Sequence, residues 1–121
     1  MKRDISLYVG DIIANINDAD GFVAGMTFEQ FAANKMAVNA VVRSIEVIGE
    51  AVKHVPDEIR AREPRVPWKD MAGMRDKCIH DYTGVDNEVV WRAVKVELPE
   101  VRPRIQSLLD ELRKNKTKPG K

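Results

Sequence analysis

Arginine, histidine and tyrosine occur together in a stretch of eight residues near the middle of the chain, Arg75-Asp76-Lys77-Cys78-Ile79-His80-Asp81-Tyr82. A histidine whose pKa lies near neutrality can take the proton of a ribose 2′-hydroxyl or give one to a leaving oxygen. A neighbouring arginine can neutralise the charge that develops on a phosphate. These residue types could therefore support phosphodiester transfer on RNA, and a neighbouring 2′-hydroxyl as nucleophile requires no metal.

The spacing of these residues predicts which of them share a face. The apolar pattern favours a helix from about Trp68 to Asp81, which ends in the glycine-containing turn Thr83-Gly84-Val85-Asp86. On such a helix Asp76 and His80 share a face, so the carboxylate could hold one imidazole nitrogen and fix which nitrogen is free. Arg75 and His80 would be about 140° apart on it. That separation favours a cleft that a second surface completes.

Each residue also has a purely structural interpretation. His80 could be a cationic histidine near a helix C-terminus, which stabilises the helix by its interaction with the helix dipole. Arg75 could be an ordinary solvated arginine. Tyr82 could be a boundary aromatic residue, and Cys78 a small buried hydrophobic one. Glu50, on a second predicted helix, is either a solvated acid or an acid that orients a residue of the site. Residue types alone leave these alternatives open.

Composition restricts the class of protein. The 121 residues are 44% hydrophobic and 32% charged, which is typical of one globular domain and unlike a disordered chain. The formal net charge of +1 excludes nucleic-acid binding through a general positive field, but it leaves room for a local basic site. Cys78 is the only cysteine, so it cannot form a disulfide within the chain, and we expect a reducing, cytoplasmic location.

Signals for membranes, metals and cofactors are missing. No apolar run reaches about 18 residues, so we expect no membrane-spanning segment, and the N-terminus does not have the pattern of a signal peptide. The only histidines are His54 and His80, and no close cysteine–histidine spacing occurs, which makes a metal site an unfavourable interpretation. A glycine-rich phosphate loop is also absent. We expect no cofactor.

Apolar residues recur at steps of three and four, which predicts helices. We expect one helix from about Asp4, its N-cap, to Val23, and the longest from about Asn34 to His54. Between them, Thr27-Phe28-Glu29-Gln30 has the pattern of a capping box that begins a short helix. Gly49 and nearby alanines keep one side of the long helix thin, which allows another helix to approach closely.

The second half of the chain continues this pattern. Asp86 is expected to cap another helix, Pro99 to kink or restart it, and the last helix to end near Leu112. No segment alternates with period two, so we expect no hairpin. The sequence thus predicts an all-α domain over residues 1–113, an up-down bundle of four to five main helices, followed by a basic, disordered tail at 114–121.

Taken together, the motif Arg75-x4-His80-x-Tyr82 and its flanks resemble the HepT-like toxins of the HEPN superfamily. Outside the motif, the likeness rests on segments spread along the chain: Ile48-Gly49-Glu50-Ala51, the run from Val66 to Met74, Val85-Asp86, Val90-Trp91 and Leu98-Pro99. It covers nearly the whole chain, roughly Arg3 to Leu112. The family often has asparagine where Asp76 stands, and often an aromatic residue after the tyrosine, where this chain has Thr83.

The resemblance implies a HEPN-like homodimer in which the Arg–His motifs of both subunits face a shared cleft. It implies a metal-independent ribonuclease, the toxin of a type VII-like toxin–antitoxin system, with Arg75 and His80 as catalytic residues. We expect Asp76 and Glu50 to support them. The implied partner is an MntA-like minimal nucleotidyltransferase antitoxin, which transfers AMP onto the motif's tyrosine, Tyr82 by position.

Two other functions remain open. The chain could be the non-catalytic nucleotide- or substrate-binding subunit of a minimal nucleotidyltransferase, because the same residues grip and cut a phosphodiester. It could also be a structural dimeric helical bundle whose motif only caps a helix. A nuclease assay with Arg75→Ala and His80→Ala variants separates these functions from RNA cleavage.

Overall fold

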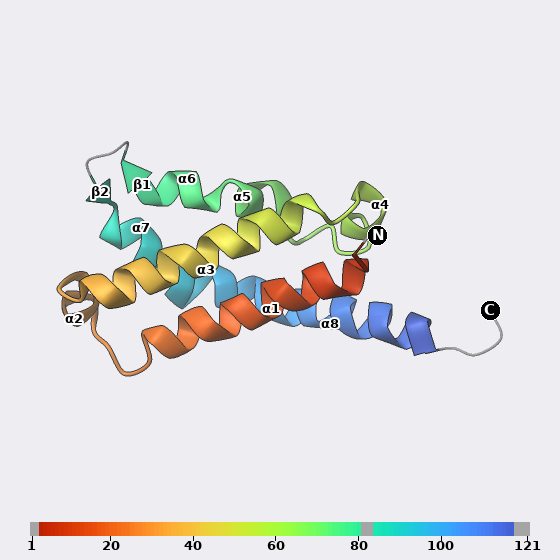
Figure 1. The fold of residues 1–121 in the computed structure, drawn as a ribbon, viewed down its shortest axis with the longest axis horizontal. Coiled ribbons are helices and arrows are strands. Elements are labelled where there is room, and N and C mark those ends of the chain that lie inside the picture. Colours follow the sequence, from red (N-terminus) through yellow and green to blue (C-terminus); the bar gives the residue numbers. More distant parts are fainter. Residues whose placement is uncertain (1–2, 81–83, 118–121) are drawn as a thin grey trace.

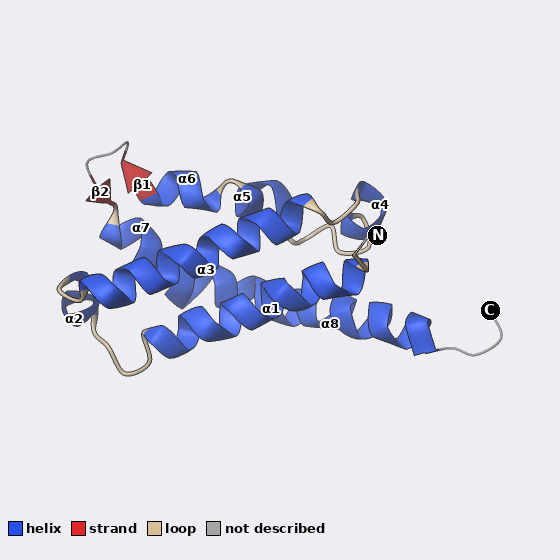
Figure 2. Ribbon diagram, in the orientation of Figure 1, coloured by secondary structure: helices blue, strands red, loops and turns tan. Residues whose placement is uncertain are grey.

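The computed structural model of the chain describes residues 3–80 and 84–117, with the side chains of residues 80, 116 and 117 left out. This part of the chain is almost entirely helical, which confirms the predicted all-α class (Figure 2). The three long helices lie side by side along the long axis of the molecule (Figure 1), and they are α1 (Ile5–Phe22), α3 (Lys35–Lys53) and α8 (Leu98–Thr117). The short helices are α2 (Phe28–Ala32), α4 (Asp57–Arg60), α5 (Trp68–Ala72), α6 (Met74–Cys78) and α7 (Asn87–Arg92).

The core lies between the long helices. Helix α1 packs against both α3 and α8, while α5 and α6 cover the other side of α3. Each long helix turns one apolar stripe inward, at steps of three and four residues. These stripes are fully or almost fully buried, and their central members are Val9, Ile12 and Ile16 of α1, Val41, Ile45 and Ile48 of α3, and Ile105, Leu108 and Leu109 of α8. No helix in the described part is long and apolar enough to cross a membrane.

The predicted helix starts are confirmed. The side chain of Asp4 accepts a hydrogen bond from the backbone N–H of Ser6, and Asp86 accepts one from Val89 at 3.2 Å. The capping box at Thr27 and Gln30 has both of its reciprocal bonds. Such caps pair helix N–H groups that would otherwise lack a partner, and each contributes about 1 kcal/mol.

The connector after α3 is fixed by two side chains. Arg60 donates to the carbonyls of Val52 and Val55, at 2.8 and 2.9 Å, one in the last turn of α3 and one just beyond it. The indole N–H of Trp68, at the start of α5, is shared between the carbonyls of Arg60 and Glu63, at 3.1 and 3.2 Å. These bonds hold the start of α5 close to the end of α3.

The predicted helix over residues 68–81 is confirmed only as far as Cys78. It breaks at Gly73 and ends at Cys78. The next residues form a strand, β1 (Ile79–His80), which pairs antiparallel with β2 (Gly84–Val85). The prediction of no hairpin was therefore also wrong.

Local chemistry explains the hairpin. Gly84 has a φ of +154°, a backbone conformation that residues other than glycine rarely adopt. Strand β2 therefore begins at a residue that can take this conformation without strain. The N–H of Asp86 donates to the carbonyl of Cys78 at 2.7 Å and closes the base of the loop. Two-residue strands are too short to produce a recognisable alternation of apolar and polar residues.

A π-helical segment precedes Pro99, where we expected a kink or a restart of the helix. This segment, η1 (Ala93–Glu97), joins α7 to α8, and the N–H of Leu98 bonds to the carbonyl of Ala93 across the wider turn. Proline lacks an N–H and its ring would clash with a carbonyl of the preceding α-helical turn, so a wider turn there lets the helix continue.

The last helix is longer than predicted. Helix α8 accommodates Pro103 within its length and runs to Thr117, past the expected end near Leu112. The first residues of the predicted tail are therefore helical. Residues 118–121 lie outside the described residues, so disorder at the very end stays a prediction.

Candidate functional site

Arg75 lies at the rim of an open hollow of about 340 Å³ between α3 and the α5–α6 pair. Two other predicted site residues, Asp76 and Glu50, line the same hollow, so the fold brings together three residues that the sequence suggested separately. The remaining lining residues were not predicted as members of the site, and they are Arg43, Glu46, Gly49, Lys53 and Ala72.

The α3 wall of this hollow is a single helical stripe. Arg43, Glu46, Glu50 and Lys53 follow one another at steps of three, four and three residues, which places them along one face of α3. A row of two acids between two basic residues at this spacing was visible in the sequence. Such a row alone is typical of a solvated helix face. Only the position of α6 beside it shows that these residues line a hollow.

Gly49 sets how closely the second wall approaches. A Cβ atom at this position would lie 3.1 Å from the carbonyl oxygen of Ala72 and 3.4 Å from that of Met71. The absence of a side chain therefore lets the end of α5 lie directly against α3, which confirms the predicted thin side. Because α6 follows α5 immediately, this contact brings Arg75 within reach of α3.

Glu46 bridges two arginines. One of its carboxylate oxygens, Oε1, accepts a hydrogen bond from Nη1 of Arg43, and the other, Oε2, lies 3.1 Å from Nε of Arg75. The hydrogen bond from Arg43 is the main cause that lowers the pKa of Glu46, and the charges of Arg43 and Arg75 lower it further against partial desolvation. The bridge joins the long helix α3 to the short helix α6, which carries Arg75.

Asp76 and Glu50, the two acids predicted to support the site, contact Arg75 less closely than Glu46 does or not at all. Oδ1 of Asp76 lies 3.5 Å from Nη1 of Arg75, and the Asp76 side chain is 84% exposed. Glu50 is also exposed, and its carboxylate pairs with Nζ of Lys53 at 3.1 Å. Both acids are thus placed at the hollow, while their supporting roles stay predictions.

His80 and Tyr82 were predicted on the same helix as Arg75. His80 instead belongs to β1, where successive side chains point to opposite faces, so the argument that Asp76 and His80 share a helical face is wrong. The 140° separation of Arg75 and His80 fails for the same reason. Tyr82, the predicted AMP acceptor, lies outside the described residues, as do Asp81 and Thr83.

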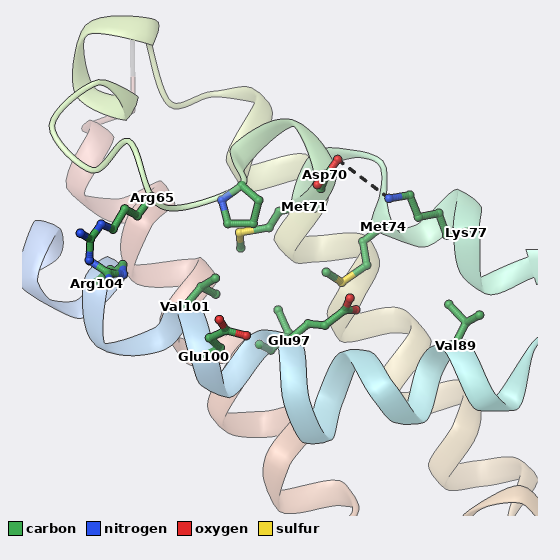
Figure 3. Close-up of a pocket in the computed structure, with 12 residues that line it drawn as sticks. Arg65, Asp70, Met71, Met74, Lys77, Val89, Glu97, Glu100, Val101 and Arg104 are labelled. Atoms are coloured by element: carbon green, nitrogen blue, oxygen red, sulfur yellow. Dashed lines mark ion pairs between the residues drawn. The ribbon is translucent and has the colours of Figure 1, made fainter.

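A second hollow, of about 410 Å³, lies on the other side of α6 (Figure 3). Its floor consists of core side chains, among them Met71, Met74 and Val101, and Arg65 and Arg104 lie beside each other at one end. At the rim, Asp70 and Lys77 form an ion pair of 3.9 Å. None of the predicted site residues lines this second hollow.

Cys78 has the structural role considered from the sequence. The thiol is completely buried, and this burial, with smaller contributions from the charges of Glu97 and Asp86, raises its pKa to about 11. It therefore stays protonated at neutral pH and packs as a small hydrophobic side chain. Among the described residues, no group of three or more histidine, cysteine, aspartate and glutamate side chains is arranged to hold a metal ion.

The sequence matches a known family and several of its named members. The model of the family described as "Ribonuclease HepT-like" matches residues 12–108. Two proteins of Methanocaldococcus jannaschii, named "Putative RNase MJ0125" and "Putative RNase MJ1216", are each 44% identical over 111 residues, which are 92% of this chain and 96% and 92% of theirs. The "Probable ribonuclease HepT" of Thermococcus cleftensis is 40% identical over 108 residues, 89% of this chain and 98% of its own.

No solved structure matches this chain. The family match covers well over half of the sequence and includes every predicted site residue from Glu50 to Tyr82. The relatives align over almost their whole length, so the likeness is not confined to one motif. The chain therefore belongs to the ribonuclease HepT-like family.

Proposed function

We propose that this chain is a metal-independent endoribonuclease, with Arg75 and His80 as its catalytic residues. The observation that carries the proposal is the family match over residues 12–108, together with relatives whose names describe ribonucleases. The position of Arg75 supports it, because its side chain is 47% exposed at the rim of an open hollow. A phosphate of a single RNA strand can reach such a group without a rearrangement of the core.

The reaction follows from the residue types. His80 takes the proton of a ribose 2′-hydroxyl, and the 2′-oxygen then forms a bond to the adjacent phosphorus. The bond from phosphorus to the 5′-oxygen breaks, and that oxygen takes a proton from water, while His80 returns the proton it accepted to the solvent. The products are a 2′,3′-cyclic phosphate and a 5′-hydroxyl end. Arg75 neutralises the charge that builds up on the phosphate oxygens.

The regulatory part of the proposal concerns Tyr82. Under this proposal, the chain is the toxin of a type VII-like toxin–antitoxin system. It acts as a homodimer in which the motifs of the two subunits face one cleft. An MntA-like nucleotidyltransferase transfers AMP from ATP to the hydroxyl of Tyr82 and releases pyrophosphate. The added phosphodiester carries a negative charge and a bulky nucleoside, which oppose RNA entry by repulsion and occlusion.

RNA cleavage in vitro tests the catalytic part. Wild type is expected to cleave single-stranded RNA equally with and without a chelator, and His80→Ala is expected to have lost this activity. Lys77→Ala is the matched control, because Lys77 lies on the same short helix as Arg75 but faces the other hollow. Equal RNA degradation by wild type and His80→Ala would overturn the mechanism, and loss of activity with a chelator would overturn metal independence.

Labelling with radioactive ATP tests the regulatory part. A nucleotidyltransferase encoded beside this chain is expected to transfer label to wild type, but not to Tyr82→Phe. Transfer to both proteins at the same level would place the acceptor elsewhere. If neither wild type nor the variants cleave RNA while Arg75→Ala weakens nucleotide binding, the chain is instead a non-catalytic binding subunit.

A further inference from the structure

The bridge formed by Glu46 brings two like charges to one point. Arg43 extends from the middle of α3 and Arg75 from α6, and each of them contacts a different oxygen of the same carboxylate. Without that carboxylate the two guanidiniums would repel each other. Among the described residues, the only other acid within ion-pair distance of either arginine is Asp76, at 3.5 Å from Arg75.

Most of the donors on these two arginines remain available. A guanidinium presents a planar fork of N–H groups, which matches the oxygens of a phosphate. Arg43 uses only Nη1 in the bridge, and Arg75 uses Nε. The two side chains are 72% and 47% exposed, and both line the hollow. The carboxylate thus fixes one side of each fork and leaves other N–H groups for a ligand.

The charge of the hollow argues for a specific contact with a phosphate. Its three cations, Arg43, Lys53 and Arg75, are matched by Glu46, Glu50 and Asp76, so a general positive field does not attract RNA there. The acids differ in how firmly they are held, however. Glu46 is fixed by two guanidiniums, whereas Asp76 is 84% exposed and lies farther from its single partner. An incoming phosphate can replace Asp76 and leave the bridge intact.

We propose that Arg43 and Arg75 form a two-arginine clamp for the phosphates of the RNA strand, and that Glu46 is the positioning residue that sets its geometry. Arg43 is the member of the clamp that belongs to the long helix α3, and it binds a phosphate next to the one held by Arg75. The proposal rests on the proposed function, since it assigns further residues to the same site. Its support comes from the bridge, the exposed donors and the shared hollow.

The first test measures RNA binding without cleavage. In the His80→Ala background, a fluorescently labelled single-stranded RNA oligonucleotide is titrated at several salt concentrations. Each lost phosphate contact is expected to reduce the slope of the logarithm of the binding constant against the logarithm of the salt concentration by about 0.7. Arg43→Ala and Arg75→Ala should each show that reduction, and the double variant should show both. Arg104→Ala, an arginine of the other hollow, should keep the original slope.

The second test separates positioning from binding in the active protein. Arg43→Ala is expected to raise KM several-fold with little change in kcat, because it removes a contact made equally to substrate and transition state. Glu46→Gln is expected to lower kcat about tenfold with a smaller change in KM, because Arg75 loses its fixed orientation. Glu46→Asp, which retains the charge on a shorter side chain, should recover part of kcat.

The outcomes distinguish the clamp from the proposed function. If Arg43→Ala changes neither the salt slope nor KM while wild type cleaves RNA, the clamp is wrong and the proposed function stands. If Glu46→Gln has the kcat of wild type, Glu46 is not a positioning residue. If wild type itself does not cleave RNA, the proposed function fails, and the binding titration alone then decides whether the two arginines bind phosphates. Thermal unfolding of each variant checks that it is folded.

Discussion

The two hollows on either side of α6 differ in what supports them. The charged hollow is lined by an exposed stripe of α3, and its side chains meet one another through ion pairs. The apolar hollow has a floor of core residues such as Met71, which is 1% exposed. Neighbouring residues of α6 separate the two, since Met74 is buried beside the apolar floor and Arg75 points to the charged stripe. One short helix thus divides a part of the core from a charged surface.

This contrast teaches where function and stability are separable. Ion pairs between exposed side chains contribute about 0–1 kcal/mol to folding, so the charged hollow can be altered with little effect on the fold. Truncation of buried side chains leaves cavities and lowers the free energy of unfolding by about 2–5 kcal/mol. Substitutions in the charged hollow should therefore change chemistry, and those in the apolar hollow should change stability. The following predictions test that separation, beginning with the largest effect.

Arg75→Ala should abolish most of the activity and leave the fold intact. We expect RNA cleavage to fall about 100- to 1,000-fold, the usual loss when one group that stabilises developing charge is removed. Stability should change by less than about 1 kcal/mol, because the Arg75 side chain is half exposed. Initial rates of RNA cleavage and urea unfolding of the same preparation measure both. A large loss of stability in this variant would contradict the separation.

Met74→Ala should have the opposite effect. Met74 is 8% exposed on the floor of the apolar hollow, so its truncation should destabilise the protein by about 2–4 kcal/mol. RNA cleavage at a temperature where the variant is folded should fall less than about tenfold, far less than in Arg75→Ala. Met36→Ala is the matched control, because Met36 is 82% exposed and its loss should leave the urea midpoint unchanged. Equal midpoints for the two variants would show that the hollow's floor is not part of the core.

Gly49→Ala should affect both properties moderately, because Gly49 lies where the two helices that form the charged hollow touch. The new Cβ would lie 3.1 Å from the carbonyl oxygen of Ala72, which is backbone, so α5 must shift by a few tenths of an ångström. We expect a loss of about 1 kcal/mol from this overpacking and a several-fold loss of cleavage as Arg75 moves away from Glu46.

Gly21→Ala provides the control for that substitution. A Cβ at Gly21 would have nothing within 4 Å, and the residue lies in the last turn of α1. The change should therefore stabilise the protein by up to about 1 kcal/mol through helix propensity, with unchanged cleavage. Gly49→Ala as stable and active as Gly21→Ala would refute the role of the close approach.

Much of the fold follows from local patterns in the sequence, because caps and apolar stripes act over a few residues. Asp4, the capping box at Thr27 and the cap at Asp86 were all predictable on this basis. Gly49 was also recognisable as a point of close approach. The strand at His80 was not, because two paired residues leave no periodic signal and depend on Gly84 across the loop.

The site itself was only partly predictable. Its motif residues were identified by type, and Arg75, Asp76 and Glu50 do meet at one hollow. The bridge through Glu46 was missed, because Arg43 and Glu46 resemble any helical ion pair until α6 is placed against α3. A contact between elements far apart in the sequence is decided by packing. Such contacts require the structure, while the caps and stripes do not.

The smallest predicted effect is the dependence of stability on pH through Glu46. Its pKa in the folded protein lies below its ordinary value of 4.5, so between the two values the unfolded chain binds more protons than the folded one. The stabilisation from the bridge is therefore complete above pH 4.5 and is lost as pH falls through the folded pKa. Glu46→Gln lacks this contribution at every pH.

The difference in urea midpoint between wild type and Glu46→Gln should thus be small at pH 7 and shrink further as the pH is lowered below 4.5. It should also shrink in about 1 M salt, which screens an exposed ion bridge. A difference that stays constant across this pH range would mean that the carboxylate contributes through packing. The bridge between the two arginines would then be an effect of side-chain shape, and the charged hollow would resemble the apolar one in what holds it together.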